Sequence, residues 1–368
     1  MQKRCLAFLL LIACALSLPG GTFVLKNDFL TLVVDPAGGR IISVRPAGRK
    51  AELTSGDGLL SDNFWNIQSN RFFLKDKLYD VNSPDPQTLA LSAHHRGGGI
   101  DFMQLDKVIA LPARSAMFQV DYRFNNLAAA MGELRYGFWM QNFVGTAGSG
   151  RKSFFPTTRG IITSDSTTAA NELWFSQPSR GWSAFIEDNG NGMAQIADPA
   201  HIKRFYQWAS RGPGALLTQE IHLEEVAIPA GGSVRTSFQF IPFYGLKKVS
   251  GAGGGLVGSV DIDPESAPGA RRKRTIKVKL FSALAQTVRV ETHCRSLPGG
   301  GAVRADSREI AFQAPATLAE FSFEHTLPTF PTLYDIDVRI FSADGAFLAA
   351  LNAPTAANVS MIAPGTDI

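Results

Sequence analysis

Residues 23–44 read FVLKNDFLTLVVDPAGGRIISV, and this stretch decides the fold. Apolar residues dominate from Phe23 to Val34 and again from Ile41 to Val44. Between them, Asp35-Pro36-Ala37-Gly38-Gly39 is rich in residues that form turns. Two apolar runs that flank such a turn predict a β-hairpin.

The same pattern of short run, turn and short run repeats along the chain, and there is almost no 3.6-residue periodicity. Turn-forming residues separate residues 108–111 from 117–124, 182–187 from 193–196, and 226–228 from 234–241. Strands at a spacing of roughly 8–12 residues, with turns between them, predict a large antiparallel sandwich or barrel.

The composition changes between Lys247 and Arg274. A Gly-rich tract is followed by a polar, breaker-rich segment and the basic run Arg271-Arg272-Lys273-Arg274, so we expect a linker over residues 251–274. The next six predicted strands fit a small immunoglobulin-like β-sandwich over residues 275–353; they are residues 276–281, 287–292, 309–313, 318–323, 334–341 and 346–351. Residues 354–368 read as a loose tail.

Composition excludes several classes of protein. The 368 residues are 45 % hydrophobic and 18 % charged, which excludes a mainly disordered chain. After the first twenty residues, no apolar run reaches the roughly 20 residues that a membrane-spanning helix needs. Three Cys are too few for a disulfide scaffold or a Cys-based zinc cluster, and a net charge of +4 does not indicate nucleic acid as the partner.

The N-terminus has the pattern of an export signal. Lys3 and Arg4 precede an apolar run from Leu6 to Leu18, so we expect residues 1–20 to be a signal peptide. Leu11-Ile12-Ala13-Cys14 has the pattern of a bacterial lipobox, which would attach a lipid to Cys14. The alternative is ordinary cleavage after Ala15 or Ser17. The expected location is the periplasm or cell envelope, with a membrane contact only through that lipid.

Residues 25–41 resemble the first hairpin of galactose-mutarotase-like (aldose 1-epimerase-like) proteins, which carries an Asn-Asp pair and a Gly-Gly-Arg-Ile turn. Here Asn27-Asp28 and Gly38-Gly39-Arg40-Ile41 hold these places. Residues 105–125 and 223–240 resemble later segments of those proteins, in the same order. The resemblance implies an all-β fold: an antiparallel β-supersandwich over residues 22–250, which in many members binds a sugar on one concave face.

The resemblance also implies a catalytic Glu and two His acids, and these are only partly present. Residues 63–74, which match the first His region, contain no His. Trp139 and Gln141 stand in the region that matches the second. Glu220 alone lies near the position of the Glu base. Since Gln does not titrate, mutarotase chemistry lacks its acids, which argues against an enzyme of that kind.

Aromatic residues are the clearest sign of a binding site. All five Trp precede residue 210, and in the run from Tyr136 to Phe143 the residues Trp139, Gln141 and Phe143 share one face of a strand. Flat aromatic faces beside amide or guanidinium donors suit a sugar ring, although large sandwiches also bury Trp. The expected ligand-binding residues are Arg71, Trp139, Gln141, Trp174 and His222.

Glu220 and His222 are two residues apart, so on a strand they point to the same face. A carboxylate beside an imidazole could act as a base or hold a sugar hydroxyl; the alternative is an ordinary polar face. The pair His94-His95 has no third metal ligand near it in sequence, and we expect an exposed turn there. No motif for a metal, nucleotide or other cofactor is present.

These observations lead to one main hypothesis, an exported carbohydrate-binding protein whose partner is an oligo- or polysaccharide. The first alternative is a carbohydrate-active enzyme, such as an epimerase, lyase or hydrolase, with Glu220 as base. The second is a structural envelope or assembly protein that docks through its C-terminal sandwich.

Overall fold

The computed structural model describes residues 21–66, 71–95, 102–129, 134–158, 160–166, 172–176, 178–262, 272–297, 302–327, 333–352 and 366–367. Within these ranges the chain consists of β-strands, turns and one 3₁₀ turn, η1 (Pro199–His201). The expected all-β class is confirmed. No helix in the described ranges is long and apolar enough to cross a membrane.

The opening residues form the predicted hairpin. A three-stranded antiparallel sheet contains β1 (Phe23–Lys26), β2 (Leu30–Asp35) and β3 (Arg40–Pro46). Gly38 and Gly39 in the β2–β3 turn have φ angles of 78° and 57°, which favour glycine. A Cβ on Gly38 would also lie 2.3 Å from the carbonyl oxygen of Lys75, so this turn requires glycine.

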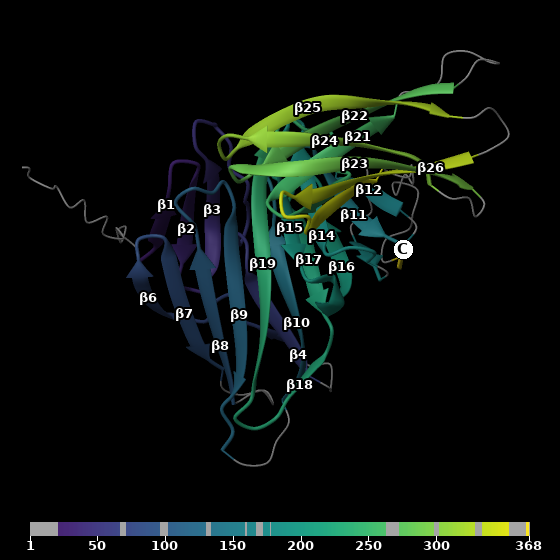
Figure 1. Cartoon of the computed structure of the whole chain (residues 1–368). Helices are drawn as coiled ribbons and strands as arrows, with labels where there is room; N and C mark the ends of the chain where they lie inside the picture. Colours follow the sequence, from purple (N-terminus) through teal and green to yellow (C-terminus); the bar gives the residue numbers. More distant parts are fainter. Residues whose placement is uncertain are drawn as a thin grey trace, which may run out of the picture.

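Two larger sheets face each other. Within the described residues, the nine-stranded sheet has the order β12-β11-β14-β15-β19-β9-β8-β7-β6. Its strands are β6 (Asp80–Asp85), β7 (Thr88–His94), β8 (Met103–Ala110), β9 (Phe118–Asn126), β11 (Arg151–Thr157), β12 (Gly160–Asp165), β14 (Trp182–Glu187), β15 (Asn191–Ala197) and β19 (Ser233–Tyr244). Figure 1 shows β6 to β9 and β19 side by side.

The eight-stranded sheet, also counted within the described residues, has the order β28-β13-β16-β17-β10-β4-β5, with β18 paired to β10 off this path. Its strands are β4 (Ser61–Asn66), β5 (Arg71–Phe73), β10 (Leu134–Phe143), β13 (Glu172–Phe175), β16 (Ile202–Ala209), β17 (Leu217–Leu223), β18 (Val226–Ile228) and β28 (Thr366–Asp367). The inner faces of the two large sheets form one apolar core.

Aromatic rings hold this core together. Phe64 and Phe138 from the eight-stranded sheet pack on Phe124 from the nine-stranded sheet, with ring centroids 6.0 and 5.1 Å apart. All three side chains are buried. Rings that meet at steep angles at these distances contribute favourable edge-to-face contacts beyond the area they bury.

One buried ion pair joins all three sheets of the large sandwich. The Nζ of Lys107 on β8 lies 2.6 Å from Oδ2 of Asp62 on β4, and both side chains are completely buried. The same Nζ donates to the carbonyl oxygens of Gly38 and Gly39, each at 2.9 Å. The Tyr122 hydroxyl donates to the other carboxylate oxygen of Asp62.

The segment around Pro229 is not the hairpin that its turn residues suggest. β18 pairs with β10 in the eight-stranded sheet, whereas β19 pairs with β9 and β15 in the nine-stranded sheet. The turn at Pro229–Gly232 therefore carries the chain from one sheet to the other. A turn of this composition bends the chain in either case, and the partners of each strand decide the outcome.

The expected linker over residues 251–274 is wrong for its described part. Residues 251–262 form β20 (Gly251–Gly253) and β21 (Leu256–Ile262), and β22 begins at Arg272. The glycines are needed for close packing, because a Cβ on Gly251 would lie 2.2 Å from the carbonyl oxygen of Ala350. Residues 263–271 lie outside the described residues.

The C-terminal part is a sandwich of two sheets with the orders β20-β21-β22-β25 and β24-β23-β26-β27, each counted within the described residues. Its further strands are β22 (Arg272–Ser282), β23 (Gln286–Leu297), β24 (Ala302–Phe312), β25 (Thr317–Leu327), β26 (Leu333–Ser342) and β27 (Phe347–Asn352). All six strands expected after residue 275 are present and both sheets contribute to one core. The immunoglobulin-like connectivity remains a prediction.

This C-terminal sandwich lies across one end of the large sandwich (Figure 1). Trp182, Phe243 and Leu246 of the large sandwich share an apolar cluster with Val257 and Phe281 of the C-terminal sandwich. The two parts are therefore packed against each other. The expected loose tail is corrected at its end, since β28 pairs in parallel with β13.

Candidate functional site

A hollow of about 570 Å³ lies on the outer face of the eight-stranded sheet. It is lined by the residues of four neighbouring strands (β10, β17, β16 and β13), by Trp65 of β4 and by Leu216. Strand alternation places these side chains: on β10, Trp139 and Gln141 face the hollow, whereas Phe138 and Met140 face the core. We call this site the aromatic hollow; its lining residues are Trp65, Trp139, Gln141, Phe143, Glu172, Trp174, Arg204, Tyr206, Trp208, Leu216, Glu220 and His222.

The register of the strands aligns these residues in rows across the sheet. In one row Gln141 lies opposite Glu220, Glu220 opposite Tyr206, and Tyr206 opposite Trp174. In the next row Trp139 lies opposite His222, which lies opposite Arg204. Neighbours in a row are in side-chain contact distance. Residues that are far apart in sequence therefore form a continuous surface.

Aromatic rings surround the imidazole of His222. Its ring centroid lies 5.7 Å from that of Trp139, nearly parallel at 15°, and 5.8 Å from that of Trp65. Trp174 and Tyr206 approach at steeper angles, with centroids at 5.5 and 6.0 Å. These rings leave His222 only 5 % exposed. The imidazole is thus packed among four rings and nearly buried in the hollow.

A glycine makes room for one of these rings. Gly137 lies opposite Trp65 in the pairing of β10 with β4. A Cβ on Gly137 would lie 1.9 Å from Cε2 of the Trp65 indole, so the indole lies directly over the glycine. Trp65 in turn packs on Trp139 with centroids 5.3 Å apart.

The carboxylate of Glu220 is fixed by three neighbours. Gln141 Nε2 donates to Oε1 at 2.9 Å, and Thr218 Oγ1 donates to the same oxygen at 3.1 Å. The second oxygen, Oε2, lies 3.6 Å from Nε2 of His222. Glu220 is 4 % exposed, and these donors compensate part of the cost of burying its charge.

On the side of β16 and β13, the hollow is lined by one positive and one negative side chain, Arg204 and Glu172. The guanidinium of Arg204 lies over the Trp174 ring at 4.3 Å from its centroid. Such stacking fixes the side chain and leaves the edge of the guanidinium able to donate hydrogen bonds. Glu172 also lines the hollow. Together with Glu220, the site therefore presents two carboxylates and one guanidinium among flat aromatic faces.

Most of the predicted site residues come together here. Trp139, Gln141, Trp174, Glu220 and His222 all line the aromatic hollow, and Glu220 and His222 point to the same face as expected. Arg71 lies in β5 with its backbone opposite Trp65, but its side chain lies outside the described part of the structure. Cys14 and the signal peptide also lie outside the described residues.

Other expectations have mixed outcomes. Four of the five Trp line the hollow, and Trp182 is buried in the cluster between the two sandwiches.

His94 belongs to the end of β7 and both His94 and His95 are half-buried, so the expected exposed turn is wrong for these two residues. Among the described residues, no group of three or more His, Cys, Asp or Glu side chains is arranged to hold a metal ion.

Sequence reasoning did not assign Arg204, Tyr206 and Trp208 to the site. They alternate on β16 with the inward-facing Phe205 and Gln207. This period of two in the run from Arg204 to Trp208 was a usable signal. Glu172 was likewise not assigned, although it stands two residues before Trp174 on the same strand face.

Comparison with known proteins gives structural neighbours only. No family model matches the chain, and no curated protein matches it. Its structure is similar to a protein from Synechocystis sp. PCC 6803, with 15 % identity, a TM-score of 0.47, and coverage of 60 % of this chain and 95 % of that one.

Two further neighbours carry the names of the superfamily that the opening hairpin resembles. A putative aldose 1-epimerase from Escherichia coli K12 is 11 % identical, with a TM-score of 0.43 over 61 % of this chain and 99 % of its own. A galactose mutarotase-like protein from Lactobacillus casei ATCC 334 is 8 % identical, with a TM-score of 0.46 over 60 % of this chain and 100 % of its own.

Proposed function

We propose that this protein binds a carbohydrate in the aromatic hollow. The observation that carries the proposal is that four Trp rings and a Tyr ring line one hollow together with the hydrogen-bonded carboxylate of Glu220, on the outer face of a sheet. Its volume of about 570 Å³ is in the ordinary range of small-ligand sites.

The chemistry of the lining fits a sugar ring on both of its surfaces. The faces of a pyranose carry C–H groups, which pack on flat aromatic rings such as Trp174. The edges carry hydroxyls, which donate to the carboxylates of Glu220 and Glu172 and accept from the guanidinium of Arg204. A purely apolar ligand would exclude water from these charged groups without offering hydrogen bonds in its place, which is costly.

Binding measurements test this proposal. A glycan array followed by calorimetry should identify a ligand for the folded wild-type protein. Trp174→Ala should weaken its binding about tenfold or more, because it removes a stacking face and the support of Arg204. Phe347→Ala is the matched control: this Phe is 57 % exposed on the C-terminal sandwich, and its removal should leave binding unchanged.

The proposal fails if the folded protein binds no glycan of a broad set. It also fails if Trp174→Ala and Phe347→Ala have the same effect. Circular dichroism and thermal unfolding of both variants show whether any loss of binding comes from unfolding.

A second candidate function is an enzyme that acts on a carbohydrate. The specific observation in its favour is the distance of 3.6 Å between Glu220 Oε2 and His222 Nε2, since a carboxylate beside an imidazole can exchange a proton with a substrate hydroxyl. Glu220→Gln separates the two functions. Lost turnover with retained ligand binding would favour the enzyme, whereas no turnover in the wild type would favour binding alone.

The proposed location is the cell envelope after export through the N-terminal signal. The support is the pattern of Lys3, Arg4 and the apolar run to Leu18. If Cys14 carries a lipid, Cys14→Ala should move the protein from the membrane fraction to the soluble fraction. An unchanged distribution would contradict lipidation.

A further inference from the structure

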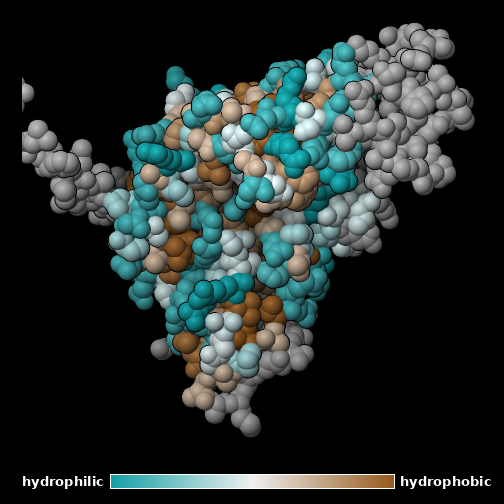
Figure 2. Space-filling view, viewed as in Figure 1, coloured by the Kyte–Doolittle hydropathy of each residue, from teal (hydrophilic) through white to brown (hydrophobic). Residues whose placement is uncertain are grey.

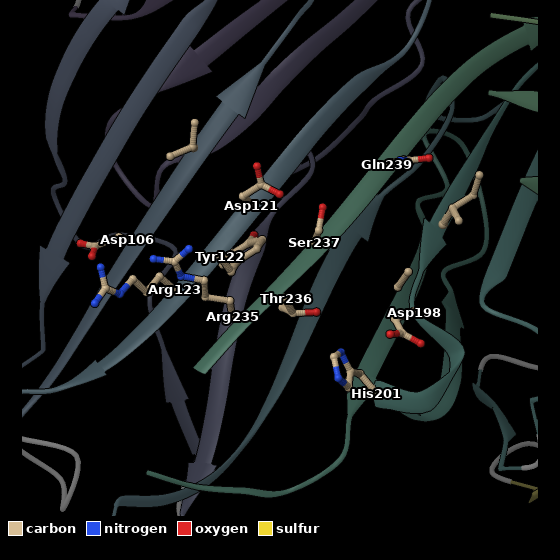
Figure 3. A pocket seen from close by; sticks show the side chains of 13 residues that line it. Asp106, Asp121, Tyr122, Arg123, Asp198, His201, Arg235, Thr236, Ser237 and Gln239 are labelled. Atoms are coloured by element: carbon tan, nitrogen blue, oxygen red, sulfur yellow. The ribbon is translucent and has the colours of Figure 1, made fainter. Parts of the chain in front are cut away.

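A second and larger hollow lies on the outer face of the nine-stranded sheet. Its volume is about 970 Å³, and it is separated from the aromatic hollow by the whole core of the large sandwich. Figure 2 shows this side of the molecule, on which hydrophilic residues and smaller hydrophobic patches are mixed. Strands β8, β9, β15 and β19 and the turn η1 supply its lining, part of which is labelled in Figure 3.

Three charged residues of this hollow lie in one row across the sheet. In the sheet register, Asp106 of β8 lies opposite Arg123 of β9, and Arg123 lies opposite Arg235 of β19. Both arginines are exposed, and Figure 3 shows their side chains extending in the same direction along the sheet. Like charges directly opposite each other on neighbouring strands are unfavourable unless an anion lies between or over them.

Asp106 does not serve as that anion. Its Oδ1 accepts hydrogen bonds from Ser92 Oγ at 2.7 Å and Gln104 Nε2 at 2.8 Å, and its Oδ2 accepts from Asn125 Nδ2 at 2.7 Å. These three donors are neutral and belong to the sheet itself. The carboxylate is therefore already solvated by its neighbours.

Both guanidinium groups keep most of their hydrogen-bonding capacity. Arg123 Nε donates to Ser233 Oγ at 3.3 Å. Within the described part of the chain, neither Arg123 nor Arg235 forms an ion pair. A guanidinium has five N–H donors in a fixed plane that matches a carboxylate bidentately, so two adjacent guanidiniums form a strong carboxylate clamp.

We propose that this hollow binds a carboxylate-bearing glycan segment, with a uronate carboxylate held by Arg123 and Arg235. The rest of the lining favours a hydroxyl-rich chain. Ser237 and Gln239 follow Arg235 on the outer face of β19, and Val108 on β8 and Ile196 on β15 add one apolar side chain on each side of them. This site is distinct from the aromatic hollow and does not depend on it.

The other carboxylates of the hollow argue against a more highly charged polymer. Asp121 lies two residues before Arg123 on the same face of β9, and Asp198 lies with His201 at η1, away from the two arginines (Figure 3); both carboxylates repel phosphate chains such as nucleic acid. They accept hydrogen bonds from sugar hydroxyls instead. A ligand with one carboxylate per ring and several hydroxyls therefore fits the lining from end to end.

The test uses oligogalacturonate and its methyl ester, which has the same sugar backbone without the charge. Calorimetry with the full chain should show binding of the acid, weaker binding at higher salt, and about tenfold or greater weakening with the methyl ester. The double variant Arg123→Gln/Arg235→Gln should show a loss of the same size. Since both side chains are exposed, the variant should keep the unfolding temperature of the wild type.

Two controls isolate the site. Arg114→Gln/Lys50→Gln removes the same charge from exposed positions outside this hollow and should leave binding unchanged. Trp174→Ala should also leave oligogalacturonate binding unchanged, because Trp174 lies on the other sheet. The proposal is overturned if the folded wild type does not bind the acid, or if both double variants lose binding equally. It is likewise overturned if Trp174→Ala abolishes binding while the Arg123→Gln/Arg235→Gln variant retains it, a result that would leave the aromatic hollow as the glycan site.

Discussion

Gly137 shapes the aromatic hollow because it has no side chain. Its neighbours along the outer face of β10 are Trp139, Gln141 and Phe143, and only at this position can an indole from β4 lie flat on the strand. A glycine inside a strand weakens the strand by itself. Here that cost allows the ring of Trp65 to be part of the hollow.

Gly137→Ala should therefore displace Trp65 and weaken ligand binding. The new Cβ would lie 1.9 Å from the Trp65 ring, a distance that forces the ring to move. We expect a loss of about 1–3 kcal/mol in the free energy of unfolding, typical of overpacking, measured by urea unfolding.

A double-mutant cycle provides the control for this prediction. Gly137→Ala/Trp65→Ala should bind ligand no more weakly than Trp65→Ala alone, because the clash is absent once the indole is removed. Additive losses in the cycle would show that Gly137 acts through some other contact.

At the scale of elements, Lys107 connects β8 with β4 across the core, through its ion pair with Asp62. Burial acts against both charges of its pair with Asp62: it raises the pKa of the carboxyl group and lowers the pKa of the ammonium group. Each charge is therefore stable only while the other is present. The ammonium also fixes the glycine turn between β2 and β3.

Lys107→Met should destabilise the fold strongly. It leaves the carboxylate of Asp62 buried without a counter-charge and removes a donor from two carbonyl oxygens, and such a change costs about 3–5 kcal/mol. Urea unfolding measures the loss. Lys203→Met is the control, since its ion pair with Glu225 is exposed and should contribute less than about 1 kcal/mol.

A second substitution tests the reason for that loss. Adding Asp62→Asn to Lys107→Met should restore part of the stability, because the isolated charge is then neutral. If the double variant is less stable than Lys107→Met, the loss of stability in Lys107→Met does not come from the unpaired charge of Asp62.

At the scale of the whole molecule, the two sandwiches share an apolar cluster and should unfold together. Phe281 of β22 is 1 % exposed, and its ring lies 5.2 Å from that of Tyr244 and 6.4 Å from that of Phe243 in the large sandwich. The Tyr244 hydroxyl also donates to the carbonyl oxygen of Ala316 across the same contact. Calorimetry should show a single unfolding transition for the full chain.

Phe281→Ala should lower the stability of both parts at once. Removing a buried Phe costs about 3–5 kcal/mol, and the cavity would open at the contact between the sandwiches. Phe347→Ala, in the exposed part of the same sandwich, should cost well under 1 kcal/mol. Two separate transitions in the wild type or in Phe347→Ala, both of which keep the shared cluster intact, would mean that this cluster does not couple the parts.

Local patterns predicted the strands and much of the aromatic hollow, because the outward and inward faces of a strand alternate with a period of two. The run from Tyr136 to Phe143 shows this directly. Local patterns could not predict which strands become neighbours. The pairing of β10 with β4 and β17 joins segments that are far apart in sequence, and it alone brings Trp65 to His222.

In the Gly-rich segment, the local pattern predicted a linker where the structure has strands. Glycine is equally common in flexible linkers and in strands that pack closely on another backbone. Around Gly251 and Gly253 the second reason applies, because a Cβ would contact the carbonyl oxygens of Ala350 and Leu348. The contacting residues come about a hundred positions later, so no local pattern contains this information.

The crossover at Pro229–Gly232 has a consequence for synthesis of the chain on the ribosome. Strand β9 can complete its pairing only when β19, the strand that follows the crossover, has been made. Until then a growing chain has one open strand edge with Phe118 and Phe124 beside it, and open edges recruit other chains. We therefore expect newly made molecules of this protein to be most prone to aggregation during that interval.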